Sequence, residues 1–311
     1  MRIVFMGTPD FAVPVLEAAI RTGAEIIGVY TQPDRPVGRK QILTPSPVKV
    51  CALEHGIPVY QPERVKRKAE VEILEALAPD LILVAAYGQI LSQRILDIPR
   101  LGCINMHASL LPKYRGAAPI QRAIVAGEKV TGITAMQMDA GMDTGAMIRK
   151  AEVPITPEDT AETLHDKLAA AAGALTETVL GMLEAAGTRL PSEPQNDAEA
   201  TYAPMLSRED GLISWDRPAQ AVLDQIRGLY PWPGTYTFWN GQKLSILDAE
   251  RSEKTADVLN PGKVHVEKDR MYVETADGMI RVRSLQLQGR KRMDAAAFLL
   301  GNHPDQQILG A

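Results

Sequence analysis

The stretch Asp80–Ala86 (DLILVAA) decides the fold class, because every residue after the aspartate is apolar. A short, uninterrupted apolar run is typical of a strand buried on both faces, as in parallel sheets covered by helices. On either side of it, apolar runs of strand length alternate with amphipathic stretches of helix length. The predicted strands are Ile3–Met6, Glu25–Tyr30, Cys103–Met106, Thr131–Met138 and Ala146–Val153, and the predicted helices are Asp10–Arg21, Val48–His55, Ile120–Ala126 and Thr160–Ala186. This alternation predicts a mostly parallel α/β sheet that the last two strands close as a hairpin.

The pattern changes after a polar segment, residues 187–204, which contains three prolines and is predicted to be a linker. Beyond a helix at Pro218–Leu229, short alternating segments indicate strands, and an Ala-rich helix at Asp294–Leu300 ends the series. The predicted strands are Gly234–Trp239, Lys243–Ala249, Gly262–Lys268, Met271–Thr275 and Met279–Leu287. Short strands in this number predict a small OB-like β-barrel. The predicted architecture is a doubly wound, Rossmann-like α/β domain (1–186), the linker (187–204) and an OB-like domain (205–311).

Composition indicates a soluble, two-domain protein. The chain has 311 residues, of which 45% are hydrophobic and 23% charged, and its net charge is -4. This charge does not indicate a nucleic-acid binder, so an RNA partner would need a local basic patch. Cys51 and Cys103 lie in predicted core segments, which favours a reducing compartment over a disulfide framework. The first strand begins at once, and we see no apolar run of the roughly 20 residues that a membrane span needs. These features together predict a cytoplasmic protein.

Polar side chains gather around the segment Gly102–Gly116 (GCINMHASLLPKYRG). Asn105 and His107 are two residues apart, so on an extended backbone both side chains project from the same face. Downstream, Asp139 and Asp143 lie in a glycine-punctuated turn, from which a carboxylate can orient a histidine. An amide and an imidazole aimed at one point suit a reaction that develops an oxyanion. The alternative is structural: a single histidine after a strand and an Asp-Gly turn both have ordinary local explanations.

Other kinds of site fit less well. Gly7-Thr8-Pro9-Asp10-Phe11-Ala12 follows the first strand, where a dinucleotide fold carries Gly-x-Gly-x-x-Gly, but proline and alanine replace the later glycines. The proline also removes an N–H that would bind pyrophosphate, so no nucleotide cofactor is expected. Neither cysteine has a partner at metal-ligand spacing, and no metal is expected. A cysteine nucleophile is not supported either, because Cys103 has no adjacent base.

Two basic segments are candidates for binding a polyanion. The first, Asp34–Lys40, lies in a long loop (Thr31–Lys49) near the carboxyl edge of the predicted sheet; such loops are uncommon unless they are functional. The second is a cluster in the predicted barrel: Arg281, Arg283, Arg290, Lys291 and Arg292. The ordinary interpretation of both is a solvated surface, and we accept it for a third basic stretch, Arg64–Lys68.

Taken together, these motifs resemble the folate-dependent formyltransferases. The resemblance rests on Asn105-Met106-His107, on Ser109-Leu110-Leu111-Pro112 with Tyr114-Arg115-Gly116, and on Asp139-x-Gly141-x-Asp143-x-Gly145. Gly7–Ala12, Thr31-Gln32-Pro33-Asp34-Arg35-Pro36 and the barrel-like tail narrow it to members that act on aminoacylated tRNA. The resemblance covers essentially the whole chain. It implies transfer of a formyl group from 10-formyltetrahydrofolate to the α-amine of methionine esterified to initiator tRNA, in translation initiation, by a monomer.

The resemblance also implies residue roles. Asn105, His107 and Asp143 would be the catalytic set. The folate site would be lined by Ser109, Leu110, Leu111 and Pro112, with the backbone of Tyr87, Gly88, Gln89 and Ile90 holding the pterin ring. The tRNA would contact Arg35, Arg39 and Lys40 of the long loop, where Gln41 and Ile42 replace the basic residues that we would expect. The predicted barrel would add phosphate contacts from its basic cluster.

Two other functions stay open at this point. The first is a folate-dependent formyltransferase for a small amine, such as glycinamide ribonucleotide or an amino sugar nucleotide. The second is an RNA-binding protein with a degenerate α/β domain. The presence of Asn105, His107 and Asp143 together argues against it, because a decayed site would not need all three.

Overall fold

The structure of the chain is a computed structural model that describes residues 1–38, 40–254 and 258–310. It divides into two compact units. The N-terminal unit consists of Met1–Pro119, Val130–Pro154 and His165–Ala203, and the C-terminal unit consists of Ile120–Lys129, Ile155–Leu164 and Pro204–Ala311.

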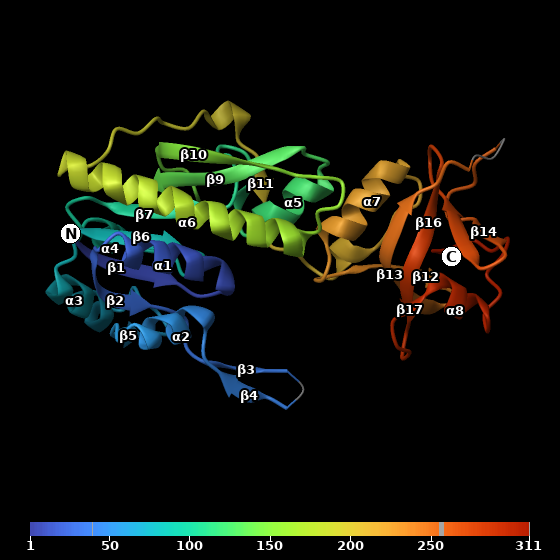
Figure 1. The fold of residues 1–311 in the computed structure, drawn as a ribbon, viewed down its shortest axis with the longest axis horizontal. Helices are drawn as coiled ribbons and strands as arrows, with labels where there is room; N and C mark the ends of the chain where they lie inside the picture. Colours follow the sequence, from blue (N-terminus) through green and yellow to red (C-terminus); the bar gives the residue numbers. More distant parts are fainter. Residues whose placement is uncertain (39, 255–257, 311) are drawn as a thin grey trace. The chain divides into compact units, whose positions relative to one another are not determined.

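A seven-stranded sheet in the order β10-β9-β7-β6-β1-β2-β5 forms the centre of the N-terminal unit (Figure 1). Its parallel strands are β1 (Arg2–Gly7), β2 (Glu25–Tyr30), β5 (Val59–Tyr60), β6 (Leu81–Ala85) and β7 (Cys103–His107). The strand β9 (Val130–Gln137) runs antiparallel to β7 and pairs with β10 (Met147–Pro154) as a hairpin. The prediction of a mostly parallel sheet closed by a hairpin is therefore confirmed.

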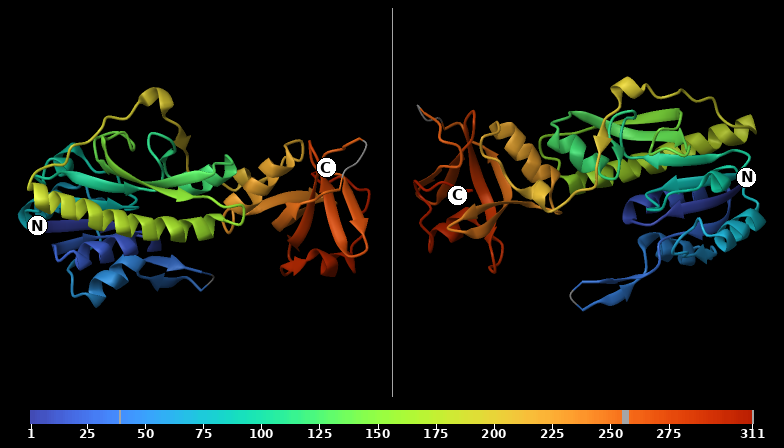
Figure 2. Two further views of the ribbon diagram at one scale, coloured as in Figure 1. Left: turned by 45° about the horizontal axis from the view of Figure 1, so that its top comes forward. Right: turned by 180° about the vertical axis from the view of Figure 1, so that it is seen from behind.

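Helices cover both faces of this sheet, as in a doubly wound fold (Figure 2). On one face, α3 (Lys68–Leu77) and α4 (Gln93–Leu96) pack over the alternate β1 residues Val4 and Met6. On the other face lie α1 (Val13–Arg21), preceded by the 3-10 turn η1 (Asp10–Ala12), α2 (Pro47–Glu54) and α6 (Ala161–Ala186). An ion pair of 2.8 Å between Arg21 and Glu177 joins α1 to α6. The alternation of β1 side chains explains both apolar layers, because successive residues point to opposite faces.

Among the described residues, α6 is the one helix long and apolar enough to cross a bilayer by length and composition. Half of its apolar stretch is buried inside the protein. Such burial is typical of a core helix, whose apolar side chains pack against other parts of the protein.

Short elements complete the N-terminal unit. The long loop after β2 contains a two-stranded hairpin, β3 (Arg35–Val37) and β4 (Ile42–Thr44). The segment predicted to be a linker includes η2 (Asp197–Glu199) and β11 (Tyr202–Ala203). Strand β11 pairs in parallel with β8 (Arg115–Gly116), which follows the polar motif. Helix α5 (Pro119–Val125) begins at the end of this region and continues into the C-terminal unit.

An antiparallel sheet in the order β12-β13-β16-β15-β14 builds the C-terminal unit, and β17 pairs with β16. The strands are β12 (Thr235–Trp239), β13 (Gln242–Arg251), β14 (Val264–Glu267), β15 (Arg270–Glu274), β16 (Met279–Leu287) and β17 (Met293–Asp294). The helical elements of this unit include the 3-10 turn η3 (Glu209–Gly211) and the helices α7 (Ala219–Gly228) and α8 (Ala295–Leu299).

The tail of the chain joins the two edges of this sheet. Leu309 N–H donates to the Gly262 carbonyl beside β14, and Gly310 N–H donates to the Phe238 carbonyl of β12, each over 2.8 Å. Edge strands left open are sites of unwanted pairing, and closure removes them. This closure around an apolar core agrees with the predicted OB-like barrel.

Candidate active site

The residues of the polar motif lie at the carboxyl end of β7. Asn105 and His107 share one face of this strand with Cys103, which is in contact with the core beneath α3 and α4. Burial raises the pKa of the Cys103 thiol to about 12, so this cysteine is not a ready nucleophile. His107 is 6% exposed and Asn105 is half-buried. Within the described part of the chain, the Asn105 side-chain amide has no hydrogen-bond partner.

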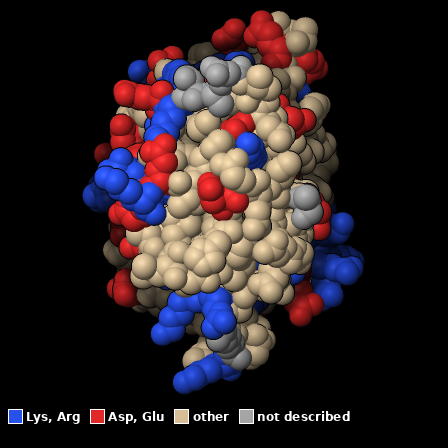
Figure 3. Space-filling model, turned by 90° about the vertical axis from the view of Figure 1, so that its right-hand side faces the viewer, with Lys and Arg blue, Asp and Glu red and all other residues tan. Residues whose placement is uncertain are grey.

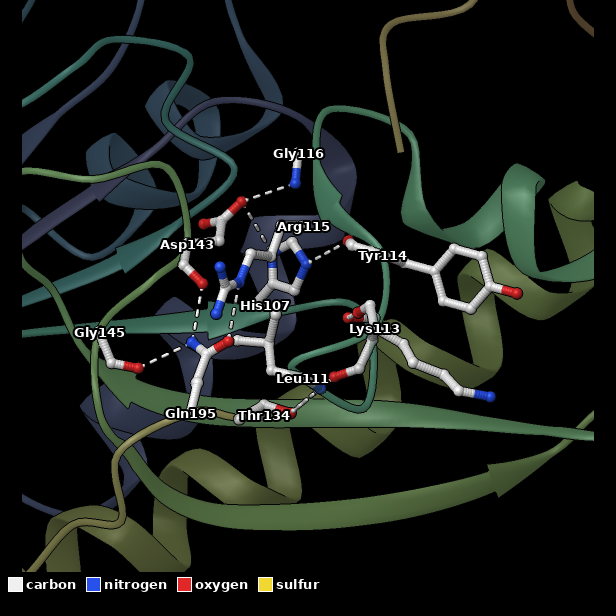
Figure 4. A network of polar contacts seen from close by, with 11 residues as sticks. His107, Leu111, Lys113, Tyr114, Arg115, Gly116, Thr134, Asp143, Gly145 and Gln195 are labelled. Atoms are coloured by element: carbon white, nitrogen blue, oxygen red, sulfur yellow. Dashed lines mark hydrogen bonds and ion pairs between the residues drawn. The ribbon is translucent and has the colours of Figure 1, made fainter. Parts of the chain in front are cut away.

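Two contacts hold the His107 imidazole (Figure 4). Its Nε2 is 2.9 Å from the Tyr114 carbonyl oxygen, and its Nδ1 is 3.6 Å from Asp143 Oδ2. Because a carbonyl oxygen only accepts, Nε2 carries a proton in this arrangement. The Nδ1 distance is that of an ion pair and is longer than a hydrogen bond. The ring therefore lies with one nitrogen fixed by the backbone and the other facing a carboxylate.

Asp143 reaches His107 by a route that the sequence does not reveal. The sequence pattern predicts that both residues follow strands at the same edge of the sheet. Strand β9 is antiparallel to β7, however, and its last residue, Gln137, pairs with Ile104 at the beginning of β7. The loop formed by residues 138–146, hereafter the Asp143 loop, must therefore fold back toward the end of β7. There, Gly116 N–H donates to Asp143 Oδ2 over 2.9 Å, which fixes the carboxylate.

The candidate folate residues Ser109–Pro112 are mostly turned into the protein. Ser109 Oγ donates to the Lys113 carbonyl over 2.6 Å, and Thr134 Oγ1 accepts from Leu111 N–H and donates to the Ser109 carbonyl. Ser109, Leu111 and Pro112 are buried, and Leu110 is half-buried. Three of the four side chains thus support the shape of this turn from within.

The second candidate folate segment, Tyr87–Ile90, follows β6 and is anchored by polar contacts. The Tyr87 carbonyl accepts from Thr8 Oγ1 and Gln32 Nε2, over 3.0 and 3.2 Å. Gln89 bridges to Val65 N–H and the Pro62 carbonyl, and Gly88 is exposed. The Ile90 side chain is 82% exposed, so this segment presents one apolar group to solvent.

Two of the candidate tRNA residues of the long loop flank its hairpin strands: Arg35 begins β3, and Lys40 precedes β4. Arg35 and Lys40 are exposed, and Arg39 lies outside the described residues. The hairpin also exposes the apolar side chains of Val37, Ile42 and Leu43. At its base, hydrogen bonds from Lys49 and Gln61 lower the pKa of the Asp34 carboxyl, which keeps this anchor ionised.

The basic cluster of the C-terminal unit separates into two parts. Arg281 Nη1 is 2.9 Å from Glu250 Oε1, and Arg283 Nε is 3.2 Å from Asp248 Oδ2. Carboxylates of β13 therefore compensate both positive charges. Arg290, Lys291 and Arg292 are exposed and form no ion pair with the residues that the structure describes. In the view of Figure 3, Lys and Arg occur in several separate groups.

Sequence reasoning does not identify the residues that support Asp143. Gln195, within the predicted linker, donates from Nε2 to the Asp143 and Gly145 carbonyls, over 2.8 Å each. Arg115 belongs to a quoted motif without a predicted role; it is buried and donates to Gln195. The Tyr114 carbonyl and the Gly116 N–H are backbone groups, which carry no sequence signal. For Gln195, the sequence offers no periodicity or motif that singles it out.

Comparison with known protein families identifies the family of this chain. The family model described as "Formyl transferase" matches residues 1–180, and a second family model, described as "Formyl transferase, C-terminal domain", matches residues 205–303. The chain belongs to the formyl transferase family, and the resemblance inferred from its motifs is confirmed.

The similar proteins within this family share one more specific name. The methionyl-tRNA formyltransferase of Bacillus subtilis is 51% identical over 313 residues, covering 99% of this chain and 98% of the relative. That of Agathobacter rectalis is 48% identical over 307 residues, covering 98% of each chain. Among solved structures, WlaRD, a sugar 3N-formyl transferase crystallised in the presence of dTDP and 5-N-formyl-THF, matches with a TM-score of 0.69. It is 17% identical and covers 94% of this chain and 99% of its own, a likeness that shows the fold alone.

Proposed function

We propose that this chain transfers the formyl group of 10-formyltetrahydrofolate to the α-amine of methionine esterified to initiator tRNA. The structural observation that carries the proposal is the His107 imidazole held between the Tyr114 carbonyl and the Asp143 carboxylate, with the Asn105 amide unpartnered on the same strand face among the described residues. The choice of substrate is supported by identities of 48–51% to methionyl-tRNA formyltransferases along nearly the whole chain.

The chemistry follows from these groups. Attack of a neutral amine on the formyl carbon produces a tetrahedral centre with a negative oxygen and a positive nitrogen. Asn105 donates a hydrogen bond to the oxygen, and a protonated His107 supplies positive charge beside it. Asp143 favours the imidazolium and accepts a proton from the nitrogen, directly or through water. The nitrogen of the folate then leaves with the bonding electron pair and takes up the proton that Asp143 received from the amine, which completes the transfer and returns the carboxylate to its starting state.

Folate is proposed to bind where the two candidate segments meet the end of β7. The anchored Tyr87–Ile90 backbone offers polar groups, and exposed Ile90 offers an apolar surface for a flat ring. The turn Ser109–Pro112, most of whose side chains are buried, is proposed to line this site. A formylated folate present in the WlaRD structure is consistent with a folate co-substrate.

The tRNA is proposed to contact both units. Arg35, Arg39 and Lys40 of the long loop contact the acceptor end, and the cations at Arg290–Arg292 contact phosphates. We propose that residues 1–186 are catalytic, that 187–204 connect, and that 205–311 bind tRNA. The enzyme is proposed to act as a cytoplasmic monomer.

The test is a formylation assay with purified protein and 10-formyltetrahydrofolate. Methionyl-tRNA, uncharged tRNA, glycinamide ribonucleotide and an amino sugar nucleotide are compared as acceptors at equal concentration. We expect formyl transfer to methionyl-tRNA alone. Transfer to a small amine instead would support the alternative substrate class, and no transfer with no folate binding would indicate an RNA-binding protein.

A further inference from the structure

Gln195 makes two hydrogen bonds that fasten the Asp143 loop. Its Nε2 donates to the Asp143 carbonyl and to the Gly145 carbonyl, each over 2.8 Å, so one amide group spans the carbonyls on either side of Thr144 (Figure 4). A single NH₂ group has two protons, and both are used here. The loop is thereby fixed by a side chain from a segment 50 residues away in sequence.

The backbone that Gln195 holds is one that needs support. Asp143 has a φ of 54°, in the left-handed region that residues other than glycine seldom adopt. Gly145 is pressed against the sheet, because a Cβ there would lie 1.7 Å from the Gln137 carbonyl oxygen. Gly145 is therefore fixed against the sheet, and the Asp143 backbone two residues earlier is held by the hydrogen bond from Gln195.

Arg115 determines which way the Gln195 amide faces. This buried arginine donates from Nε to Gln195 Oε1 over 2.9 Å and from Nη2 to Asp197 over 2.8 Å. Because arginine has no acceptor, the amide oxygen must face it and the NH₂ must face the two loop carbonyls. Arg115 lies one residue before Gly116, whose N–H fixes the Asp143 carboxylate. The backbone and the carboxylate of Asp143 are thus held by neighbouring parts of one network.

We propose that Gln195 is a positioning residue for formyl transfer, which acts by holding the Asp143 loop in its left-handed conformation. This inference rests on the proposed catalytic role of Asp143. It assigns no substrate contact to Gln195. Its effect is therefore expected in kcat, while KM for the folate and for methionyl-tRNA stays close to that of the wild type.

The sharpest variant is Gln195→Glu, which keeps the length and the oxygen that accepts from Arg115 but replaces the NH₂ donor by an oxygen. That oxygen would face two carbonyl oxygens and repel them. We expect kcat to fall by about 10²-fold, the effect of misplacing a reacting group by about 1 Å. The matched control is Glu199→Gln, the reverse exchange on the same segment, where the exposed side chain contacts only Asn196 among the described residues; its kcat should equal that of the wild type.

Two further measurements separate positioning from a general structural role. In an Asp143→Asn background, Gln195→Glu should cause no further loss of kcat, because its effect passes through Asp143. Amide hydrogen exchange in residues 139–145 should be faster in Gln195→Glu than in the wild type, whatever the substrate. An unchanged kcat, a fully additive loss in the double variant, or unchanged exchange would each overturn the proposal.

The outcome remains interpretable if other parts fail. Gln195→Asn keeps the amide group but shortens the side chain by one methylene, so the amide no longer reaches the loop. This variant replaces Gln195→Glu in the tests if Gln195→Glu does not fold. If the wild type does not formylate methionyl-tRNA, the proposed function fails. The exchange measurement still decides whether Gln195 holds the loop.

Discussion

At the scale of single residues, the site depends on how each polar group is already committed. His107 uses Nε2 on a backbone carbonyl and turns Nδ1 toward Asp143, while the Asn105 amide has no partner within the described residues. The buried ring thus has an oxygen opposite each nitrogen, a backbone carbonyl on one side and a carboxylate on the other. The free amide is the group suited to meet an incoming oxygen.

The charge of Asp143 can be tested without disturbing the loop. In Asp143→Asn, the side-chain oxygen still accepts from Gly116 N–H, and asparagine tolerates the left-handed conformation. We expect kcat for methionyl-tRNA formylation to fall by about 10²–10³-fold with an unchanged melting temperature, because only the negative charge is lost. Near-normal turnover would remove Asp143 from the mechanism.

The control for this variant is Asp139→Asn in the same loop. Asp139 is exposed, and its Oδ1 accepts from Gly141 N–H and Thr144 Oγ1, which an amide oxygen also does. Its turnover should stay within a few-fold of the wild type. A loss equal to that of Asp143→Asn would mean that loop structure, and not the charge beside His107, decides the rate.

At the scale of elements, local capping and sheet direction together bring the loops to the site. Helix α2 begins after the β3–β4 hairpin at Ser46, whose Oγ accepts from Lys49 N–H over 3.1 Å and contacts the Thr31 hydroxyl at 2.6 Å. Thr31 is buried at the end of β2. One serine therefore ties the beginning of α2 to the strand from which the hairpin departs.

Removing this cap should cost measurable stability. We expect Ser46→Ala to lower the free energy of unfolding by about 1–2 kcal/mol, because α2 loses its N-cap and the buried Thr31 hydroxyl loses a partner. Chemical denaturation measures the change. Ser92→Ala is the matched control: Ser92 occupies the N-cap position of α4 but makes no capping hydrogen bond within the described chain, so a loss below about 0.5 kcal/mol is expected. Equal losses in the two variants would contradict this explanation.

At the scale of the whole molecule, the charge distribution has to reconcile an acidic chain with a polyanionic substrate. The net charge is -4, and Figure 3 shows basic residues in separate groups on one face. We therefore expect the proposed tRNA binding to depend on a few uncompensated cations rather than on the overall field. Arg290, Lys291 and Arg292 meet this requirement better than Arg281 and Arg283, which have carboxylate partners.

The two groups of cations can be compared directly. We expect the triple alanine variant of Arg290, Lys291 and Arg292 to bind tRNA more weakly and to reduce the salt slope of log K by about 1 for each phosphate that the variant no longer neutralises. Arg281→Ala with Arg283→Ala should change the slope less. Binding of a folate analogue should be unaffected in both. An unchanged tRNA affinity in the triple variant would identify the cluster as ordinary solvated surface.

The sequence predicts the elements better than it predicts the site. The strands Glu25–Tyr30 and Met279–Leu287 have the predicted bounds, because an apolar run in the first, alternation in the second and the flanking turns of both are local signals. The helix expected over Asp10–Arg21 instead begins with a 3-10 turn, η1, before α1. Gln195 and the Tyr114 carbonyl escape prediction, because their roles arise from contacts far apart in sequence or from the backbone itself.

Local sequence signals are enough to predict the layered sheet, the closing hairpin and the position of Asn105 and His107 on one strand face, since periodicity and nearest neighbours are encoded locally. The approach of Asp143 to His107 is set by the arrangement of the strands in space. The antiparallel course of β9 starts the Asp143 loop at the opposite end of β7, and Gly116 and Gln195 then hold the returning loop in place. Such a meeting depends on strand direction and on long-range hydrogen bonds, which no single stretch of sequence specifies.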